Sequence, residues 1–329
     1  MIKALTLCQI YLDETWWNYA EETRHTIQRA WRYFATACGN RQIDRIEPSD
    51  GEKYKGWHLK THRSKTTANI HLRSVSATLN WAVQTKRLLR INPLKAVRQF
   101  RVTRQPVRTY TDDQVVRMIR FAPSLQWQGI LLCAYTTGLR RGAILNLTRD
   151  NIRKGYVYVE PKNNTARTWE WEPKDKEQRK VPLVPILTDL MEQLDTYYVF
   201  IPPARYARML SLKDAGCLKE RQRKCPLENF RRSFVGIQRR AFGQQIGDFH
   251  MLRKTFTTNM CNGLPEHFVM RLTGHSNLKT MTHYLGSRES YFDMARKIAL
   301  DGLKNGGIPC RNTPVDETRA CGSDGRYQS

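Results

Sequence analysis

The sequence lacks long hydrophobic runs and carries far less acidic than basic charge. None of its 329 residues lie in a stretch approaching the roughly 20 apolar residues that a membrane-spanning helix needs. The first residues include acidic side chains and no small-residue cleavage site, unlike a secretory signal. We therefore expect a cytoplasmic protein that is neither secreted nor embedded in a membrane.

Cysteine motifs and nucleotide-binding motifs are missing as well. The eight cysteines form no C-x-x-C pair and no Cys/His cluster at the spacing of a zinc site. We interpret them as free thiols in a reducing compartment. No Walker-type G-x-x-x-x-G-K-[ST] sequence is present, so nothing supports nucleotide hydrolysis.

Basic residues dominate the charge. The 55 Lys and Arg outnumber the 30 Asp and Glu, which gives a formal net charge of +25. Between Lys53 and Arg120 there are 16 basic residues and only two acidic ones. This imbalance favours a polyanionic partner. A lipid surface is the alternative, but we find neither a basic amphipathic anchor nor a lipidation motif, and we predict binding to nucleic acid.

Hydrophobic periodicity predicts a helical bundle in the N-terminal part of the chain. Trp31, Phe34 and Ala35 mark a helix that ends near Gly39. A second helix is predicted by apolar residues that recur at spacings of three and four. These residues are Ala68, Leu72, Val75, Leu79 and Ala82.

A linker and a second domain follow the predicted bundle. Residues 92–111 carry two prolines and a series of arginines with little periodicity, which is typical of an extended linker. Thr111, followed by two aspartates, resembles the N-cap of a new helix. We expect a helical domain that binds nucleic acid over residues 1–104, with its linker from about residue 92, and a second domain over residues 105–304.

The second domain mixes helices with a small sheet. A buried helix is predicted from Gln126 to Asn146, with a break at Gly138. Three short strands follow, and the pattern is helical again from Leu187 to about Leu303. The strands are predicted at Tyr156–Glu160, Arg167–Glu172 and Arg179–Leu183. The fold class is therefore mainly α with a small antiparallel β-sheet, and residues 305–329 are predicted to be a disordered tail.

Four segments of the second domain contain residues suited to one chemistry. The first is Thr137-Gly138-Leu139-Arg140, and the second is Lys174 ahead of Arg179-Lys180-Val181-Pro182-Leu183. The third is His250-Met251-Leu252-Arg253, in which the histidine and the arginine share one helix face and can address one anion. The fourth is Leu272-Thr273-Gly274-His275-Ser276, with Tyr284 nine residues after His275.

In this order the segments resemble the tyrosine recombinase family, the phage-integrase type of site-specific DNA recombinase. The family has T-G-x-R, a lysine in a β-turn before R-x-V-P-L, H-x-x-R, and L-G-H-S with a tyrosine nine positions on. The resemblance covers about residues 110–290. The N-terminal bundle and Asn92-Pro93-Leu94 also resemble the family's core-binding domain.

The resemblance implies a catalytic set of six residues and a DNA strand transfer. Tyr284 would be the nucleophile, and Lys174 would give a proton to the 5′-oxygen. His250 would relay a proton or contact the phosphate, and His275 would donate a hydrogen bond to it. Arginine suits the phosphate because its planar fork donates two parallel bonds, as expected for Arg140 and Arg253.

The segments contain no carboxylate cluster suited to Mg²⁺, and we expect neither a metal nor a cofactor. Double-stranded DNA is the implied partner, with self-association into a tetramer on paired DNA sites and a location at the nucleoid. Contacts with the phosphate backbone of DNA are predicted for basic residues of the bundle and linker. These are Lys60, Arg63, Lys65, Arg73, Arg101, Arg104 and Arg108.

The sequence departs from the family pattern at one functional position. The family carries an acidic residue three positions after its first arginine, where this chain has Ala143. Such an acid would orient the arginine or a neighbouring helix, so its absence bears on activity and not on fold. The lysine position has alternatives, because Lys176 shares the turn with Lys174 and Lys162 lies in the preceding turn.

Two other functions remain open at this level. One is a DNA-binding relative that no longer cleaves DNA, which Ala143 favours. The other is a type IB topoisomerase, which uses a tyrosine and similar arginines. The spacing between His275 and Tyr284 and the Leu-Thr-Gly-His sequence favour the recombinase.

Overall fold

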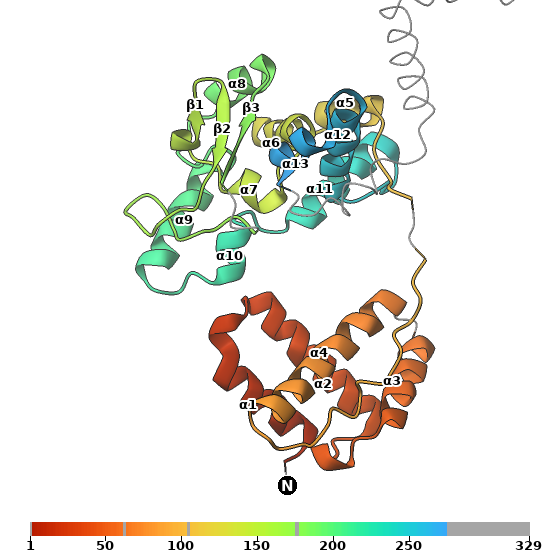
Figure 1. The fold of residues 1–329 in the computed structure, drawn as a ribbon. Helices are drawn as coiled ribbons and strands as arrows, with labels where there is room; N and C mark the ends of the chain where they lie inside the picture. The colour runs from red at the N-terminus through yellow and green to blue at the C-terminus, as the bar shows by residue number, and fades with distance from the viewer. Residues whose placement is uncertain (1, 62–63, 104–105, 175–177, 275–329) are drawn as a thin grey trace, which may run out of the picture. The chain divides into compact units, whose positions relative to one another are not determined.

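The computed structural model describes residues 2–61, 64–103, 106–174 and 178–274, and the chain divides into two compact units after residue 105 (Figure 1). The N-terminal unit is helical, and the C-terminal unit combines helices with one small antiparallel sheet. The predicted fold class is confirmed. No helix among the described residues is long and apolar enough to cross a membrane.

The described residues of the N-terminal unit form four helices and two short 3₁₀ turns. Helix α2 packs against α1, α3 and α4, and it carries the fully buried Trp31 and Phe34 into the middle of the bundle. The indole of Trp31 donates a 3.1 Å hydrogen bond to Thr78 Oγ1 on α4. The elements are α1 (Ala4–Thr15), η1 (Trp16–Asn18), α2 (Glu21–Cys38), η2 (Ile43–Arg45), α3 (Pro48–Lys60) and α4 (Lys65–Gln84).

Both helix predictions in this unit are confirmed. Helix α2 ends at Cys38, and Gly39 caps it with a φ of 87°, which glycine adopts without strain. The predicted stripe is the buried face of α4, since Ala68, Leu72, Val75, Leu79 and Ala82 are all buried. Apolar spacing was sufficient here because one face of each helix is covered by the bundle.

The segment after α4 packs onto the bundle instead of leaving it. Leu94 is buried in the core and Val97 packs against it. Asn92 donates to the carbonyl oxygen of Ser76 at 3.1 Å, and its own Oδ1 accepts from Leu94 N at 2.9 Å. The prediction that an extended linker begins near Asn92 is therefore wrong for residues 92–100. The proline and arginine content predicted an extended linker, but the packing of Leu94 and Val97 on the bundle holds this segment against it.

Asn69 of α4 fixes the far end of this segment. Its amide donates to the carbonyl oxygen of Phe100 at 2.9 Å, and its Oδ1 accepts from Phe100 N at 2.8 Å. A single buried asparagine thus satisfies both backbone groups of one residue, as an adjacent strand would.

The C-terminal unit is centred on helix α6 (Leu125–Thr137). It contacts α5 (Asp112–Arg120), α8 (Pro185–Glu192) and α12 (His250–Gly263), and these helices lie around it in Figure 1. Thr111 caps α5 by accepting a hydrogen bond from Gln114 N at 3.3 Å, as predicted. The other helices are α7 (Arg141–Leu145), η3 (Arg149–Asn151), α9 (Pro203–Asp214), α10 (Glu220–Lys224), α11 (Phe230–Phe242) and α13 (Glu266–Thr273).

The sheet has the order β1-β2-β3 and is antiparallel throughout. Strand β2 (Tyr156–Val159) pairs with both β1 (Ile152–Arg153) and β3 (Arg179–Pro182), with Val157 opposite Val181. The prediction of strands near 156–160 and 179–183 is confirmed. A strand at Arg167–Glu172 was wrong: within it only Trp171 forms a bridge, to Lys162.

Candidate active site

Arg253 joins three of the predicted motifs through its guanidinium. Its Nη1 donates to the carbonyl oxygen of Gly138 at 2.7 Å, and its Nη2 donates to that of Thr273 at 2.5 Å. The side chain is only 2% exposed, and hydrogen bonds from an ionised donor in such surroundings are strong. One side chain of α12 therefore holds the Thr137–Arg140 segment and the turn before His275.

The turn that carries Arg140 depends on the glycine before it. Gly138 ends α6 in the left-handed region, with a φ of 61°. A Cβ there would lie 2.8 Å from Cγ of Phe256 on α12, so the ring and the backbone conformation both require glycine. Arg140 follows in extended conformation at the N-cap of α7 and is half-buried.

His250 begins α12, one turn before Arg253, and its surroundings disfavour the protonated ring. The side chain retains solvent exposure, yet desolvation by neighbouring atoms is the largest effect that lowers the pKa of His250. The charges of Arg253, Lys254 and Arg140 lower the pKa further, whereas Asp248 opposes them. His250, Arg140 and Arg253 are therefore near enough to form one electrostatic cluster.

The lysine candidates differ in their surroundings. Lys174 is exposed at the end of the connection from β2 towards β3. Lys162 is buried, and its Nζ donates to Thr148 Oγ1 at 3.2 Å and to Asn151 Oδ1. Burial lowers the pKa of Lys162 to about 8, against the raising effect of Asp150 and Glu160. Lys162 thus anchors the connection, which favours Lys174 for the proton-donor role that the resemblance implies. Lys176 lies outside the described residues.

Asn146 is a structural residue of the site that sequence reasoning missed. It accepts a 2.9 Å hydrogen bond from the indole of Trp169, which stacks on Tyr198 at a centroid distance of 4.0 Å. Its amide donates to the carbonyl oxygens of Gly142 and Arg223 at 2.8 and 3.0 Å. The sequence signal for this role is that an asparagine stands inside the apolar run Ala143–Leu147. Such an amide is buried, and buried amides are almost always hydrogen-bonded.

Ala143, at the position where the family carries an acid, belongs to the hydrophobic core of the C-terminal unit and is 6% exposed. The helix that contains it, α7, is held through Asn146 instead. An ionised carboxylate at residue 143 would be desolvated by apolar neighbours.

A second missed residue is Tyr110, which fixes the start of the unit to α12. Its backbone N–H donates to Thr255 Oγ1 at 2.9 Å, and its hydroxyl donates to the carbonyl oxygen of Asp248 at 3.0 Å. The ring is 3% exposed. The segment that enters the unit therefore supports the first turn of α12, where His250 lies.

The predicted DNA-contacting cations lie on the surface wherever they are described. Lys60 ends α3, Lys65 begins α4, and Arg73 lies on the exposed side of α4. Arg101 and Arg108 are exposed in segments without helix or strand. Arg63 and Arg104 lie outside the described residues.

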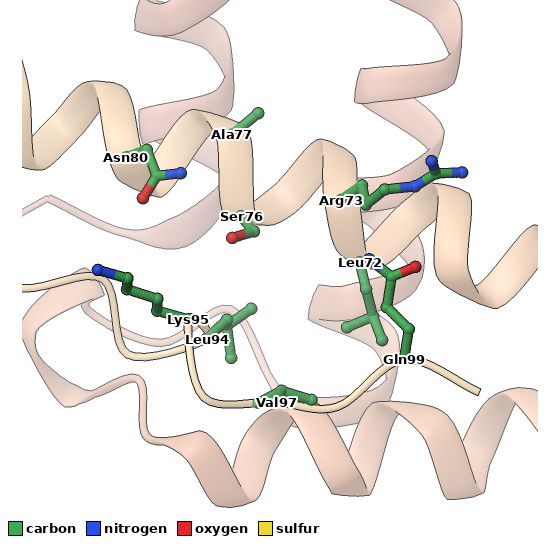
Figure 2. Close-up of a pocket in the computed structure, with 9 residues that line it drawn as sticks. All are labelled: Leu72, Arg73, Ser76, Ala77, Asn80, Leu94, Lys95, Val97 and Gln99. Atoms are coloured by element: carbon green, nitrogen blue, oxygen red, sulfur yellow. The ribbon is translucent and has the colours of Figure 1, made fainter. Parts of the chain in front are cut away.

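A hollow of about 280 Å³ lies beside Arg73, between α4 and residues 94–99. Figure 2 shows the residues that line it. Its lining includes Lys95 as a second cation, together with Ser76, Asn80 and Gln99. The polar and basic lining is compatible with an anionic group, and the floor is formed by apolar residues such as Leu94.

His275 and Tyr284 lie outside the described residues, as do the last part of the helical pattern predicted up to about Leu303 and the predicted tail at 305–329. The structure thus brings together Arg140, His250 and Arg253, and it places the turn that immediately precedes His275 on Arg253.

Known proteins resemble this chain in sequence. A tyrosine recombinase of Thermosipho africanus (strain TCF52B) is 23% identical over 296 residues, which cover 85% of this chain and 94% of the relative.

Solved structures resemble it in fold. A lambda integrase dimer bound to a COC′ core site gives a TM-score of 0.65 at 15% identity, over 84% of this chain and 96% of that one. The Tn1549 transposon integrase in complex with a circular intermediate DNA gives 0.66 at 19% identity, over 90% and 99%. The Phage integrase family matches residues 108–290, more than half of the sequence and all four motifs. The chain therefore belongs to the phage integrase family of tyrosine recombinases.

Proposed function

We propose that this protein is a site-specific DNA recombinase that cleaves and rejoins DNA strands through a 3′-phosphotyrosine intermediate on Tyr284. The observation that supports this best is the guanidinium of Arg253, which holds Gly138 and Thr273. Segments separated by more than a hundred residues meet there, and each continues directly into a residue of the proposed catalytic set.

The proposed chemistry is a transesterification. The Tyr284 oxygen attacks phosphorus, a bond between them forms, and the bond from phosphorus to the 5′-oxygen breaks. The phosphodiester energy is retained in the tyrosyl ester, so a second strand can be joined without ATP. Arg140 and Arg253 stabilise the charge that grows on the phosphoryl oxygens.

Proton transfers accompany both bond changes. The phenol of Tyr284 must lose a proton, which the neighbouring cations favour. Lys174 donates a proton to the departing 5′-oxygen, and its exposed position leaves it accessible to a bound DNA strand. Desolvation and the neighbouring cations lower the pKa of His250, which favours the neutral ring that a proton relay requires. His275 donates a hydrogen bond to the phosphate.

DNA binding rests on the basic charge of both units. The exposed Lys60, Lys65 and Arg73 of the N-terminal unit would contact phosphates, as would Arg101 and Arg108. Lambda integrase has been solved as a tetramer bound to a Holliday junction, which supports a tetramer on paired sites for this chain.

Trapping of the covalent intermediate tests the proposal. The probe is a nicked duplex with the sequences that flank the coding region in its genome, because loss of the short strand beyond the nick prevents religation. We expect a denaturant-stable adduct with the wild-type chain and none with Tyr284→Phe, while Tyr291→Phe serves as the control. An adduct that persists in Tyr284→Phe would overturn the assignment.

The role of Lys174 has its own test. A sulfur in place of the bridging 5′-oxygen leaves without protonation, so it should restore cleavage by Lys174→Ala but not by Arg140→Ala. Lys176→Ala and Lys162→Ala are the controls. If the sulfur substrate restored cleavage by Lys176→Ala or Lys162→Ala instead of by Lys174→Ala, the proton donor would be that other lysine.

A binding-only function is the second candidate, and Ala143 is the observation that favours it. Tight DNA binding with no adduct on the flanking sequences would support it. Relaxation of a supercoiled plasmid without a defined site would instead indicate a topoisomerase.

A further inference from the structure

We propose that Arg179, at the start of β3, is a positioning residue that holds the Thr273–Gly274 turn in place for strand cleavage. The inference rests on the proposed function, because it assigns a role in that reaction. It comes from a contact between two segments that are almost a hundred residues apart.

The contact is formed by the guanidinium of Arg179 and the backbone of Gly274. A Cβ built on Gly274 would lie 3.0 Å from Cζ of Arg179 and still closer to Nη1. Any side chain at residue 274 would therefore meet the arginine. The guanidinium occupies the space that glycine leaves.

The position of Gly274 explains why a cation suits this place. Gly274 ends α13 in the left-handed region with a φ of 66°, and its N–H donates to the carbonyl oxygen of Met270 at 2.7 Å. The last carbonyl groups of a helix carry partial negative charge, so a guanidinium beside them is stabilising. Its planar shape allows it to lie flat on the glycine backbone.

Arg179 reaches this turn because of the register of β3. Arg179 pairs with Val159 and is half-buried, and Val181 on the same face of the strand is buried. Lys180 points to the other face, where its Nζ lies 5.0 Å from the ring centre of Tyr156. The alternation of the strand thus separates two neighbouring cations.

The turn is held from two sides. Arg253 donates to the carbonyl oxygen of Thr273 from α12, and Arg179 lies against Gly274 from β3. In sequence, His275 follows this turn directly, and Arg179 is only five residues from Lys174. Arg179 therefore couples the strand after the proposed proton donor to the turn before a proposed phosphate ligand.

The matched pair Arg179→Gln and Lys180→Gln tests the proposal in the full-length chain. Each removes one positive charge from β3, but only the first removes the contact with Gly274. On the nicked duplex described above, we expect Arg179→Gln to slow single-turnover adduct formation by about ten-fold or more. Its DNA Kd and Tm should stay close to those of Lys180→Gln, which should cleave at nearly the wild-type rate.

A double-mutant cycle with Gly274→Ala keeps the test specific. The backbone strain of alanine at a φ of 66° is common to both backgrounds, whereas the collision with the guanidinium exists only when Arg179 is present. Gly274→Ala should therefore reduce the cleavage rate less in an Arg179→Ala background than in the wild type.

The outcomes separate this inference from the proposed function. If the wild-type chain forms no adduct, the proposed function fails. If the wild-type chain forms the adduct, but Arg179→Gln cleaves as fast as Lys180→Gln or loses rate only in proportion to lost folding or DNA binding, Arg179 is not a positioning residue. Additive effects in the cycle would overturn the contact as the cause.

Discussion

Arg253 donates a 2.5 Å hydrogen bond to the carbonyl oxygen of Thr273, twenty residues further along the chain. The same guanidinium donates to Gly138, and its side chain is almost completely buried. A residue expected from its motif to act on phosphate is therefore also a structural link of the fold. Its substitution should affect stability as well as cleavage.

The variant Arg253→Lys tests this double role. A lysine keeps the charge, but a single ammonium cannot reproduce the fork that reaches both carbonyl groups. We expect a loss of about 2–4 kcal/mol in the free energy of unfolding and of about a hundred-fold in adduct formation. Urea denaturation and the trapping assay measure these changes. Arg271→Lys, an exposed substitution on α13, should change neither, and an unaltered Arg253→Lys protein would contradict the structural role.

The buried Lys162 predicts a stability that rises with pH. Its pKa is lowered from 10.5 to about 8 in the folded chain, so between these values the unfolded state binds more protons than the folded state. The free energy of unfolding should therefore rise by up to about 3 kcal/mol across this window. Lys162→Met should remove this increase, which urea denaturation at several pH values measures.

Lys180→Met is the control for this effect, because Lys180 is exposed on β3. It should leave the pH dependence of the wild type unchanged. A wild-type slope that persists in Lys162→Met would show that another group causes it.

His250 predicts a smaller effect at acidic pH. Desolvation and the neighbouring arginines lower its pKa below the ordinary value of 6.5, so below that pH the unfolded state takes up the proton first. The wild type should lose stability relative to His250→Gln as the pH falls from about 7 to 5. Solvent exposure limits the difference to below about 1 kcal/mol. The opposite slope in denaturation midpoints would mean that the ring has a stabilising anionic partner.

Arg73 predicts a change in the salt dependence of DNA binding. If it neutralises one phosphate, Arg73→Ala should weaken binding to any duplex and reduce the slope of log K against log salt by about 1. Lys86→Ala is the matched control, since the charge of Lys86 is already paired with Glu14 at 2.6 Å. Fluorescence anisotropy at several salt concentrations distinguishes the two. Equal slopes for both variants would remove Arg73 from the DNA surface.

The sequence was a good guide wherever the information is local. Apolar spacing identified the buried face of α4, and Thr111 and Gly138 identified helix ends because their roles depend only on near neighbours. Motif order predicted the proposed site, and the charges of Arg140 and Arg253 do act on the ring of His250. The buried helix face and the helix ends can each be predicted from residues within a few positions of one another.

The errors concern contacts between distant segments. Residues 167–172 alternate as a strand does, but Trp169 extends to Asn146 and Tyr198 while Trp171 has only a single bridging partner. Whether an extended segment joins a sheet depends on a partner strand that its own pattern cannot identify. The clamp between Asn69 and Phe100 and the contact between Arg179 and Gly274 likewise have no local signature.

The two hydrogen bonds between Asn69 and Phe100 also limit the length of free chain that connects the two units. The chain is pinned to the N-terminal unit at Phe100, and it is pinned to the C-terminal unit at Tyr110 through Thr255. Nine residues lie between these two attachment points, which makes ten residue steps, so the two points can be at most about 33–36 Å apart. That reach is about one helical turn of DNA. Because this length is set by the chain between the two attachment points, an insertion within residues 101–109 should increase it without disturbing the contacts of Asn69 or Thr255.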